Sequence, residues 1–419
     1  MKWITCQIGA REHYAIPRVL HGEQKLECLY TDFWAGSIWQ QASNFLGNSA
    51  LSMRFHPDLA DAAVKSFDLT TLVNSAFGGK TGNAYDWFLT VGADFGRGVE
   101  DSLKRNKKIL WNEMIFFGYD TGFLEPARWV KSRGGKNVVC QMDPSRFEVD
   151  LVQAEEKNWP GWAKRPLDVP VSFSNRRRQE WAIADLVMVN SRWSQQALIQ
   201  QGVREEKIVI VPLAYEPSKV RGQRAESRSQ ESENSGLSSQ VSSLSAHPLR
   251  VLFLGQVILR KGIQYLIEAA KILENESVRF DVVGPVGISD EALKSAPPNM
   301  IFHGSINRNQ APDFFCNADI FVLPTLSDGF ALTQIEAMAY GLPVITTPNC
   351  GEVVTDGLDG FIVPARDGKA LSEAIQAFLK NPENLQRMGA AARKKVCQFS
   401  LAKLGENLAS LEARLELVP

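Results

Sequence analysis

Residues 323–348, LPTLSDGFALTQIEAMAYGLPVITTP, decide the fold expected for the second half of the chain. The apolar run 320–323 that leads into this stretch predicts a buried strand. A turn containing Gly329 follows, then a short helical pattern that Gly341 and Pro343 end, then the apolar run 344–346. Strand, helix and strand in this order predict one unit of a doubly wound parallel sheet, whose carboxyl edge is where ligands bind.

The same alternation extends over the rest of the second half. Further strands are predicted at residues 250–255, 279–283, 300–303 and 361–363, with a helix at 262–273. After these strands only helical patterns occur, at 372–379, 385–396 and 401–417. We expect the last helix to cross back onto the first lobe.

The first half carries the same pattern less clearly. Strands at 136–142, 185–190 and 207–213, with a helix at 191–201 that begins at Ser191, predict a strand-helix-strand unit. Aromatic residues and glycines interrupt the periodic runs of the first hundred residues, which we assign to this lobe by elimination.

The length and composition fit two soluble α/β domains. A chain of 419 residues is too long for one compact core, and we expect lobes at 1–216 and 249–400 with the closing helix at 401–419. The segment 217–248 is rich in serine and predicts a flexible linker or insertion. A net charge of -1 argues against a nucleic-acid partner.

The cysteines and the shortness of the apolar runs indicate the expected cellular compartment. The six cysteines form no CxxC pair and the five histidines have no metal-ligand spacing, so we expect free thiols and no structural metal. No apolar run is long enough for a signal sequence or a membrane span. The expected location is the cytoplasm, with peripheral contact at the inner membrane face left open.

The turn after residue 323 is the first candidate for a binding site. Asp328, Gly329 and the backbone N–H groups that follow, near a helix N-terminus, suit the hydroxyl and phosphate groups of a polar ligand. A simpler interpretation is that Thr333 and Glu336 form an S/T-x-x-E capping box, in which Glu336 only stabilises the helix.

The loop 255–262, GQVILRKG, is the second candidate. Arg260 and Lys261 stand at a predicted helix N-terminus, where cations are disfavoured unless an anion such as a diphosphate binds. The alternative is a solvated basic pair. The basic run 175–180, NRRRQE, is interpreted as a solvated face, with contact to an anionic acceptor or lipid surface as the less favoured hypothesis.

Together these motifs resemble retaining glycosyltransferases of family four, which have the GT-B fold. The likeness is carried by residues 328–345, by the loop 255–262 with Gly284, and by GEVVTDGLDGFIVPARD at 351–367. In the first lobe only 184–198 and 205–215 match. The resemblance implies two Rossmann-like lobes facing across a cleft, with the acceptor on 1–216 and the nucleotide sugar on 249–400.

The resemblance also implies roles for individual residues. Arg260 and Lys261 would stabilise the leaving diphosphate without a metal ion, Asp328 would hold the donor sugar, and Glu336 the ribose. The predicted catalytic residues are therefore Arg260, Lys261 and Asp328, and the predicted donor-binding residues are Gly255, Gln256, Gly329, Phe330, Ala331, Leu332 and Glu336.

Three positions depart from the family pattern. Asp328 stands where glutamate is usual, and Gln256 replaces an arginine, which removes one phosphate-binding charge. In the first lobe, Asp143 follows the strand 136–142 where the family often has a histidine. We take Asp143 as the candidate acceptor-side residue, although aspartate before proline is also a turn signal.

The predicted function is transfer of a sugar, with retention, from a nucleoside diphosphate sugar to a carbohydrate or lipid-linked hydroxyl acceptor in polysaccharide or glycolipid biosynthesis. No cofactor is expected. Two alternatives use the same diphosphate site: a sugar-nucleotide epimerase or phosphorylase, and a non-catalytic sugar-nucleotide-binding protein.

Overall fold

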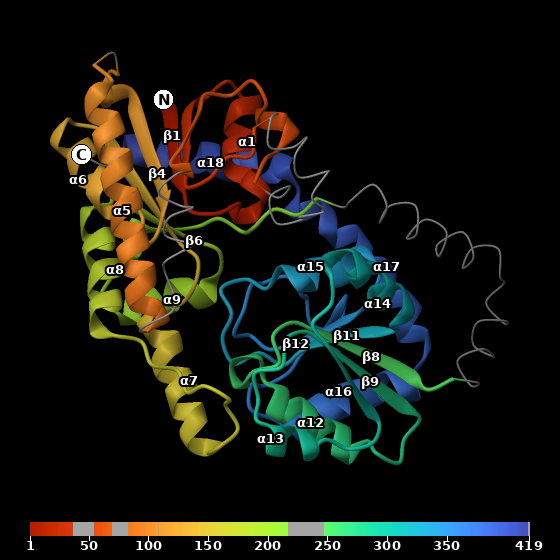
Figure 1. Cartoon of the computed structure of the whole chain (residues 1–419). Helices are drawn as coiled ribbons and strands as arrows, with labels where there is room; N and C mark the ends of the chain where they lie inside the picture. Colours follow the sequence, from red (N-terminus) through yellow and green to blue (C-terminus); the bar gives the residue numbers. More distant parts are fainter. Residues whose placement is uncertain (37–53, 69–82, 108, 217–246, 418–419) are drawn as a thin grey trace.

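The chain folds into two α/β lobes that face each other (Figure 1). The computed structural model describes residues 1–36, 54–68, 83–107, 109–216 and 247–417. The predicted linker, 217–248, therefore lies outside the described residues except for its last two positions.

The N-terminal lobe is built on a seven-stranded sheet in which every pairing is parallel. Its spatial order is β3-β2-β1-β4-β5-β6-β7. This order reverses direction between β1 and β4, as in doubly wound folds. The strands are β1 (Lys2–Gln7), β2 (Leu26–Thr31), β3 (Val64–Ser66), β4 (Met114–Tyr119), β5 (Lys136–Gln141), β6 (Leu186–Val189) and β7 (Ile208–Ile210).

Alternating side chains bury both faces of this sheet. Ile4 and Cys6 point to one face, whereas Trp3 points to the other, because successive residues of a strand face opposite ways. The first face is covered by α5 (Ala84–Arg105), α6 (Leu124–Ser132), α8 (Val171–Ile183) and α9 (Arg192–Gln200). The second is covered by α1 (Ala15–Gly22) and α18 (Leu401–Glu416).

The C-terminal lobe repeats the design with six parallel strands in the order β10-β9-β8-β11-β12-β13. They are β8 (Leu249–Leu254), β9 (Val278–Val283), β10 (Met300–Gly304), β11 (Ile320–Leu323), β12 (Val344–Thr346) and β13 (Gly360–Ile362). One face packs on α12 (Ile263–Ile272), α13 (Asp290–Lys294) and α16 (Gly368–Lys380), and the other on α14 (Ala311–Asn317), α15 (Leu332–Ala339) and α17 (Glu383–Val396).

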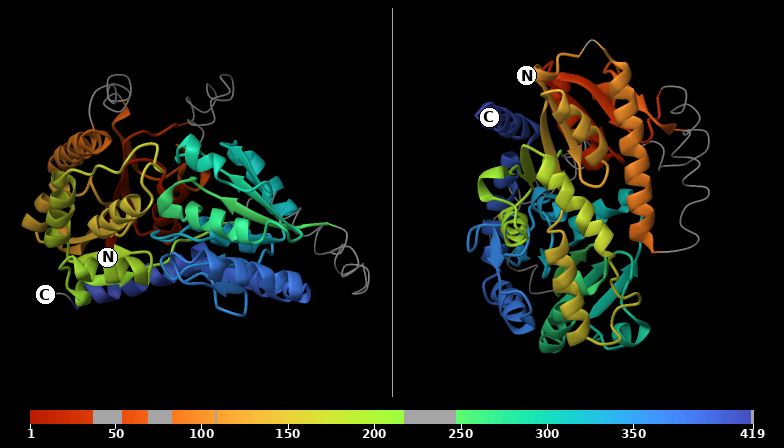
Figure 2. Two further views of the ribbon diagram at one scale, coloured as in Figure 1. Left: turned by 90° about the horizontal axis from the view of Figure 1, so that it is seen from below. Right: turned by 90° about the vertical axis from the view of Figure 1, so that its left-hand side faces the viewer.

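The last helix crosses from the C-terminal lobe to the N-terminal lobe, as predicted. The left view of Figure 2 shows the final helices, in blue, running along one side of the molecule from lobe to lobe. Leu404, Leu408, Leu411 and Leu415 of α18 are buried against the N-terminal lobe. The α/β fold with two doubly wound lobes and a returning helix is thus confirmed.

Candidate active site

The two loops singled out in the C-terminal lobe lie side by side at the carboxyl edge of its sheet. The loop after β8 contains a 3-10 turn, η5 (Leu259–Lys261), and the loop after β11 contains Asp328. Lys261 forms an ion pair with Asp328, and both side chains are nearly buried. Burial alone would raise the pKa of Asp328, but the charges of Lys261 and Arg260 outweigh it and hold this pKa below its ordinary value.

Helix α15 begins two residues earlier than a capping box with Thr333 as its N-cap requires. Ala331 precedes the helix in the left-handed region, with φ of 64°, and no side chain caps the first turn. Thr333 is therefore inside the helix, and the capping-box interpretation of Thr333 and Glu336 is wrong. Glu336 instead lies 4.0 Å from the Arg308 guanidinium. Gly341, with φ of 74°, ends the helix as predicted.

The predicted donor-binding residues differ in how far their side chains are exposed. The Phe330 ring is buried in the core and meets Phe399 edge to face, with ring centroids 5.9 Å apart, so that only its backbone can serve a ligand. Ala331 and Leu332 are half-buried at the start of α15. Gly255 is half-buried at the end of β8, and the neighbouring Gln256 is exposed.

Gly329 brings the loop after β11 against the N-terminal lobe. A Cβ atom placed on Gly329 would lie 2.0 Å from the Met142 carbonyl oxygen at the end of β5, so only glycine fits there. The Asn190 amide donates a hydrogen bond of 2.9 Å to the same oxygen. The two lobes are therefore in backbone contact beside Asp328.

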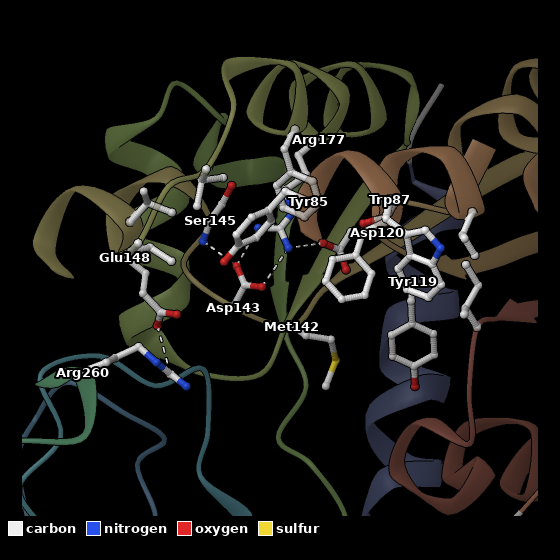
Figure 3. A pocket seen from close by; sticks show the side chains of 18 of the residues that line it. Tyr85, Trp87, Tyr119, Asp120, Met142, Asp143, Ser145, Glu148, Arg177 and Arg260 are labelled. Atoms are coloured by element: carbon white, nitrogen blue, oxygen red, sulfur yellow. Dashed lines mark hydrogen bonds and ion pairs between the residues drawn. The ribbon is translucent and has the colours of Figure 1, made fainter. Parts of the chain in front are cut away.

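A cavity of about 650 Å³ opens at the carboxyl edge of the N-terminal sheet (Figure 3). The ends of β1, β2, β4 and β5 form its floor, and residues 256–260 of the C-terminal lobe close one side. Aromatic rings line much of the wall, from Tyr85, Trp87, Phe88, Phe95, Tyr119 and Phe173. Aromatic faces beside carboxylates suit a ligand that has both apolar and hydroxyl surfaces.

Asp143 faces this cavity and is held by Arg177. Figure 3 shows the Arg177 guanidinium between Asp143 and Asp120. It donates two hydrogen bonds of 2.8 Å to the Asp143 carboxylate and lies 2.6 Å from an Asp120 oxygen. Burial would raise the pKa of Asp143, but the Arg177 charge and hydrogen bonds keep it lowered. Asp143 is thus an ionised acceptor of hydrogen bonds at the cavity wall.

The basic run 175–180 is not a simple solvated face. Arg177 is buried, and Arg176 forms a bidentate pair with Glu125, with distances of 2.6 and 2.8 Å. Only Asn175, Arg178 and Gln179 of this run are exposed. The solvated interpretation is wrong for Arg176 and Arg177, because the carboxylates that bury them come from distant segments.

Glu148, which the sequence did not single out, joins the two lobes by contacting the loops after β8 and β11. It belongs to the first turn of α7 (Arg146–Asn158). Its carboxylate lies 3.5 Å from an Arg260 nitrogen and accepts a 2.7 Å hydrogen bond from the Ser327 hydroxyl. Arg260 also donates to the Ser327 carbonyl at 3.1 Å. Burial, opposed by the Arg260 charge, raises the pKa of Glu148 to about 7.

The C-terminal end of α7 also contacts the C-terminal lobe. Glu155 is fully buried and accepts hydrogen bonds from Gln264, Tyr265 and Arg366 of that lobe. After the helix, Trp162 packs against the C-terminal core, and Ala163 forms a β-bridge with Ile288. In Figure 1, α7 (yellow) extends alongside the lower lobe. We refer to α7 and residues 159–164 as the clasp.

The described part of the chain has no group of three or more His, Cys, Asp and Glu side chains arranged to hold a metal ion. The six cysteines are free thiols: Cys6, Cys28, Cys140 and Cys350 are buried, Cys316 is half-buried and Cys397 is exposed. Among the helices that the structure describes, none combines the length and apolar character needed to cross a bilayer.

Residues 237–395 match the family model of glycosyl transferases group 1. The chain is 31% identical over 170 residues to the capsular polysaccharide biosynthesis glycosyltransferase CapM of Staphylococcus aureus, covering 38% of this chain and 44% of CapM. It is 23% identical over 299 residues to the amylovoran biosynthesis glycosyltransferase AmsK of Erwinia amylovora, covering 68% and 65%. The chain thus spans less than two thirds of the length of each of these curated relatives.

Solved structures share the whole fold. Sucrose-phosphate synthase from Thermosynechococcus elongatus aligns with a TM-score of 0.64 at 17% identity, covering 100% of both chains. Anabaena HepE in complex with UDP aligns with a TM-score of 0.61 at 14% identity, covering 99% of this chain and 100% of HepE. At such identities the likeness establishes the two-lobed GT-B architecture.

Proposed function

We propose, from the premise that the C-terminal lobe belongs to the glycosyl transferases group 1 family, that this chain transfers a sugar from a nucleoside diphosphate sugar to a hydroxyl acceptor. The observation that carries the proposal is the meeting of Arg260, Lys261 and Asp328 at one sheet edge, directly opposite an aromatic-lined cavity of the other lobe. One lobe offers charges for a diphosphate and the other offers room for an acceptor.

The chemistry follows from where charge develops. Breaking the bond between the anomeric carbon and the phosphate leaves negative charge on the diphosphate, which Lys261 and Arg260 would offset by fixed electrostatic attraction. Asp328 holds Lys261 through an ion pair, so the ammonium is already oriented. Glu336 would hold the nucleotide ribose, and no metal ion is required by this arrangement. Retention at the anomeric carbon is part of the proposal.

The acceptor is assigned to the cavity of the N-terminal lobe. Its carboxylates are balanced by arginines: Asp32 pairs with Arg54, and Asp143 with Arg177. Because these two carboxylates are already paired, we assign the cavity to a neutral, hydroxyl-bearing acceptor. Asp143 would accept a hydrogen bond from an acceptor hydroxyl. CapM and AmsK are named for polysaccharide biosynthesis, which supports a carbohydrate or lipid-linked carbohydrate as the acceptor class.

The test begins with thermal-shift screening of UDP-, GDP- and ADP-sugars, because a ligand that binds only the native state raises the melting temperature. Release of the nucleoside diphosphate is then measured with oligosaccharide acceptors. Lys261→Ala should lower kcat by about 10²- to 10³-fold, while Lys271→Ala, an exposed lysine of the next helix, should leave it unchanged. Orthophosphate-dependent turnover without a nucleotide would instead support a phosphorylase, and binding without turnover a sensor.

A further inference from the structure

The Glu148 carboxylate contacts Arg260, the cation that the proposed mechanism assigns to the diphosphate. Its oxygen contacts both Arg260, in the loop after β8, and Ser327, in the loop after β11. These two loops form the predicted donor site, yet Glu148 comes from the opposite lobe. A diphosphate bound by Arg260 would bring two negative charges next to this carboxylate.

We propose that Glu148 competes with the donor diphosphate for Arg260, so that donor binding requires Glu148 to take up a proton. The inference rests on the proposed function, because it takes Arg260 as the partner of the diphosphate. It assigns to Glu148 a role in setting donor affinity, as a positioning residue that acts through Arg260.

The surroundings of Glu148 favour protonation over persistent charge. Its side chain is only 16% exposed, so its charge is poorly solvated. Asp143, from the loop after β5, and Asp328 both raise its pKa, whereas Arg260 lowers it. Tyr85 of α5 also interacts electrostatically with Glu148. A diphosphate would add further negative charge, so the pKa of Glu148 must rise above its free value of about 7 on binding.

The uptake of a proton predicts the direction in which donor affinity changes with pH. When the donor binds, one proton passes from the buffer to the Glu148 carboxylate, and no bond of the donor breaks. Because binding raises the pKa of Glu148, the affinity for the donor should be highest at pH values below the pKa of the free protein. Above that pKa, the affinity should fall by up to about tenfold per pH unit. A nucleoside diphosphate sugar lacks the weakly acidic group of a terminal phosphate, so its own titration does not interfere.

The experiment is isothermal calorimetry with UDP-glucose, GDP-mannose or ADP-glucose, whichever binds, at about pH 6 and about pH 8.5. In two buffers of different ionisation enthalpy, the wild type should show uptake of up to about half a proton near pH 7, because the free carboxyl is already half protonated there, and of close to one proton at about pH 8.5. Glu148→Gln should bind the donor about tenfold more tightly than the wild type at the higher pH and should lose the pH dependence. The matched control is Asp150→Asn, an exposed acid of the same helix paired with Arg146, which should behave as the wild type.

The outcomes separate the two proposals. Equal, pH-independent affinity of the wild type and Glu148→Gln, with no proton uptake, would overturn the role of Glu148 and leave the glycosyltransferase proposal standing. Absence of donor binding in all three proteins would overturn the proposed function and this inference with it. Because proton uptake is measured on the wild type, the test does not depend on the folding of the variant.

Discussion

Arg177 neutralises two carboxylates at once, so its replacement should lower the stability of the protein. The guanidinium is buried between Asp120 and Asp143. Arg177→Gln would leave both acids without their ion-pair partner, and we expect the free energy of unfolding to fall by about 3 to 5 kcal/mol. Urea denaturation followed by circular dichroism measures this change.

The adjacent arginine supplies the control. Arg178 is exposed on the same helix, and Arg178→Gln should change the free energy of unfolding by less than about 0.5 kcal/mol. Similar losses for the two variants would show that charge on α8, and not the buried pair, carries the effect.

Gly329 should be intolerant of any side chain. A Cβ atom there would meet the Met142 carbonyl oxygen at 2.0 Å, which forces the lobes apart beside Asp328. Because a displacement of about 1 Å between reacting groups can cost about 10²-fold in rate, Gly329→Ala should lower kcat by roughly that factor. Gly22→Ala is the matched control, since a Cβ atom on Gly22 meets nothing within 4 Å. Full turnover by Gly329→Ala would show that this lobe contact is not used in catalysis.

The sequence predicted one half of the candidate site better than the other. Lys261 and Asp328 stand in short motifs whose spacing already places them at a sheet edge. Glu148 does not, because α7 carries charged residues all along and gives no local sign of which are buried. Its partner Arg260 is 112 positions away in the sequence, so its burial depends on how the lobes meet. Arg177 was missed for the same reason.

Among the elements, the clasp fixes the orientation of the lobes. Glu155 of α7 is fully buried and accepts hydrogen bonds from Gln264 Nε2 at 3.0 Å and Arg366 Nε at 2.8 Å. Glu155→Ala would leave these donors unsatisfied, and we expect a loss of about 2 to 3 kcal/mol of stability. Hydrogen exchange should become faster in α7 and in the 159–164 segment before it does elsewhere.

The control for the clasp is Lys157→Ala, an exposed position on the same helix, which should leave exchange unchanged. Unaltered exchange in Glu155→Ala would mean that Trp162 and the bridge between Ala163 and Ile288 hold the segment without the carboxylate.

Element prediction succeeded for several strands that are apolar on both faces but missed β4, Met114–Tyr119, although it is buried along its whole length. β11, Ile320–Leu323, is a run of four apolar residues and was placed correctly. β1, Lys2–Gln7, was not recognised, because Lys2, Thr5 and Gln7 interrupt its pattern. Thr5 and Gln7 are buried nonetheless, and Gln7 ends the strand at the cavity. The polar residues that obscure the strand are thus partly those that shape the candidate acceptor site.

At the scale of the whole molecule, α18 makes the N-terminal lobe depend on the end of the chain. Leu411 is fully buried in one cluster with Trp3, Ile16 and Leu20, and Glu412 pairs with the N-terminal ammonium and Lys25. Leu411→Ala should therefore cost about 3 kcal/mol through the cavity that it leaves.

The elements in which hydrogen exchange accelerates show to which lobe α18 belongs energetically. If α18 is energetically part of the N-terminal lobe, hydrogen exchange in Leu411→Ala should accelerate in β1 and α1, although these lie some four hundred residues earlier. The control is Leu417→Ala, whose side chain is 84% exposed and should have no effect. Acceleration confined to α17 and β8 to β13 would instead assign the helix to the C-terminal lobe. The first outcome means that the N-terminal lobe reaches full stability only after the last helix is in place, which couples the two halves of the site during folding.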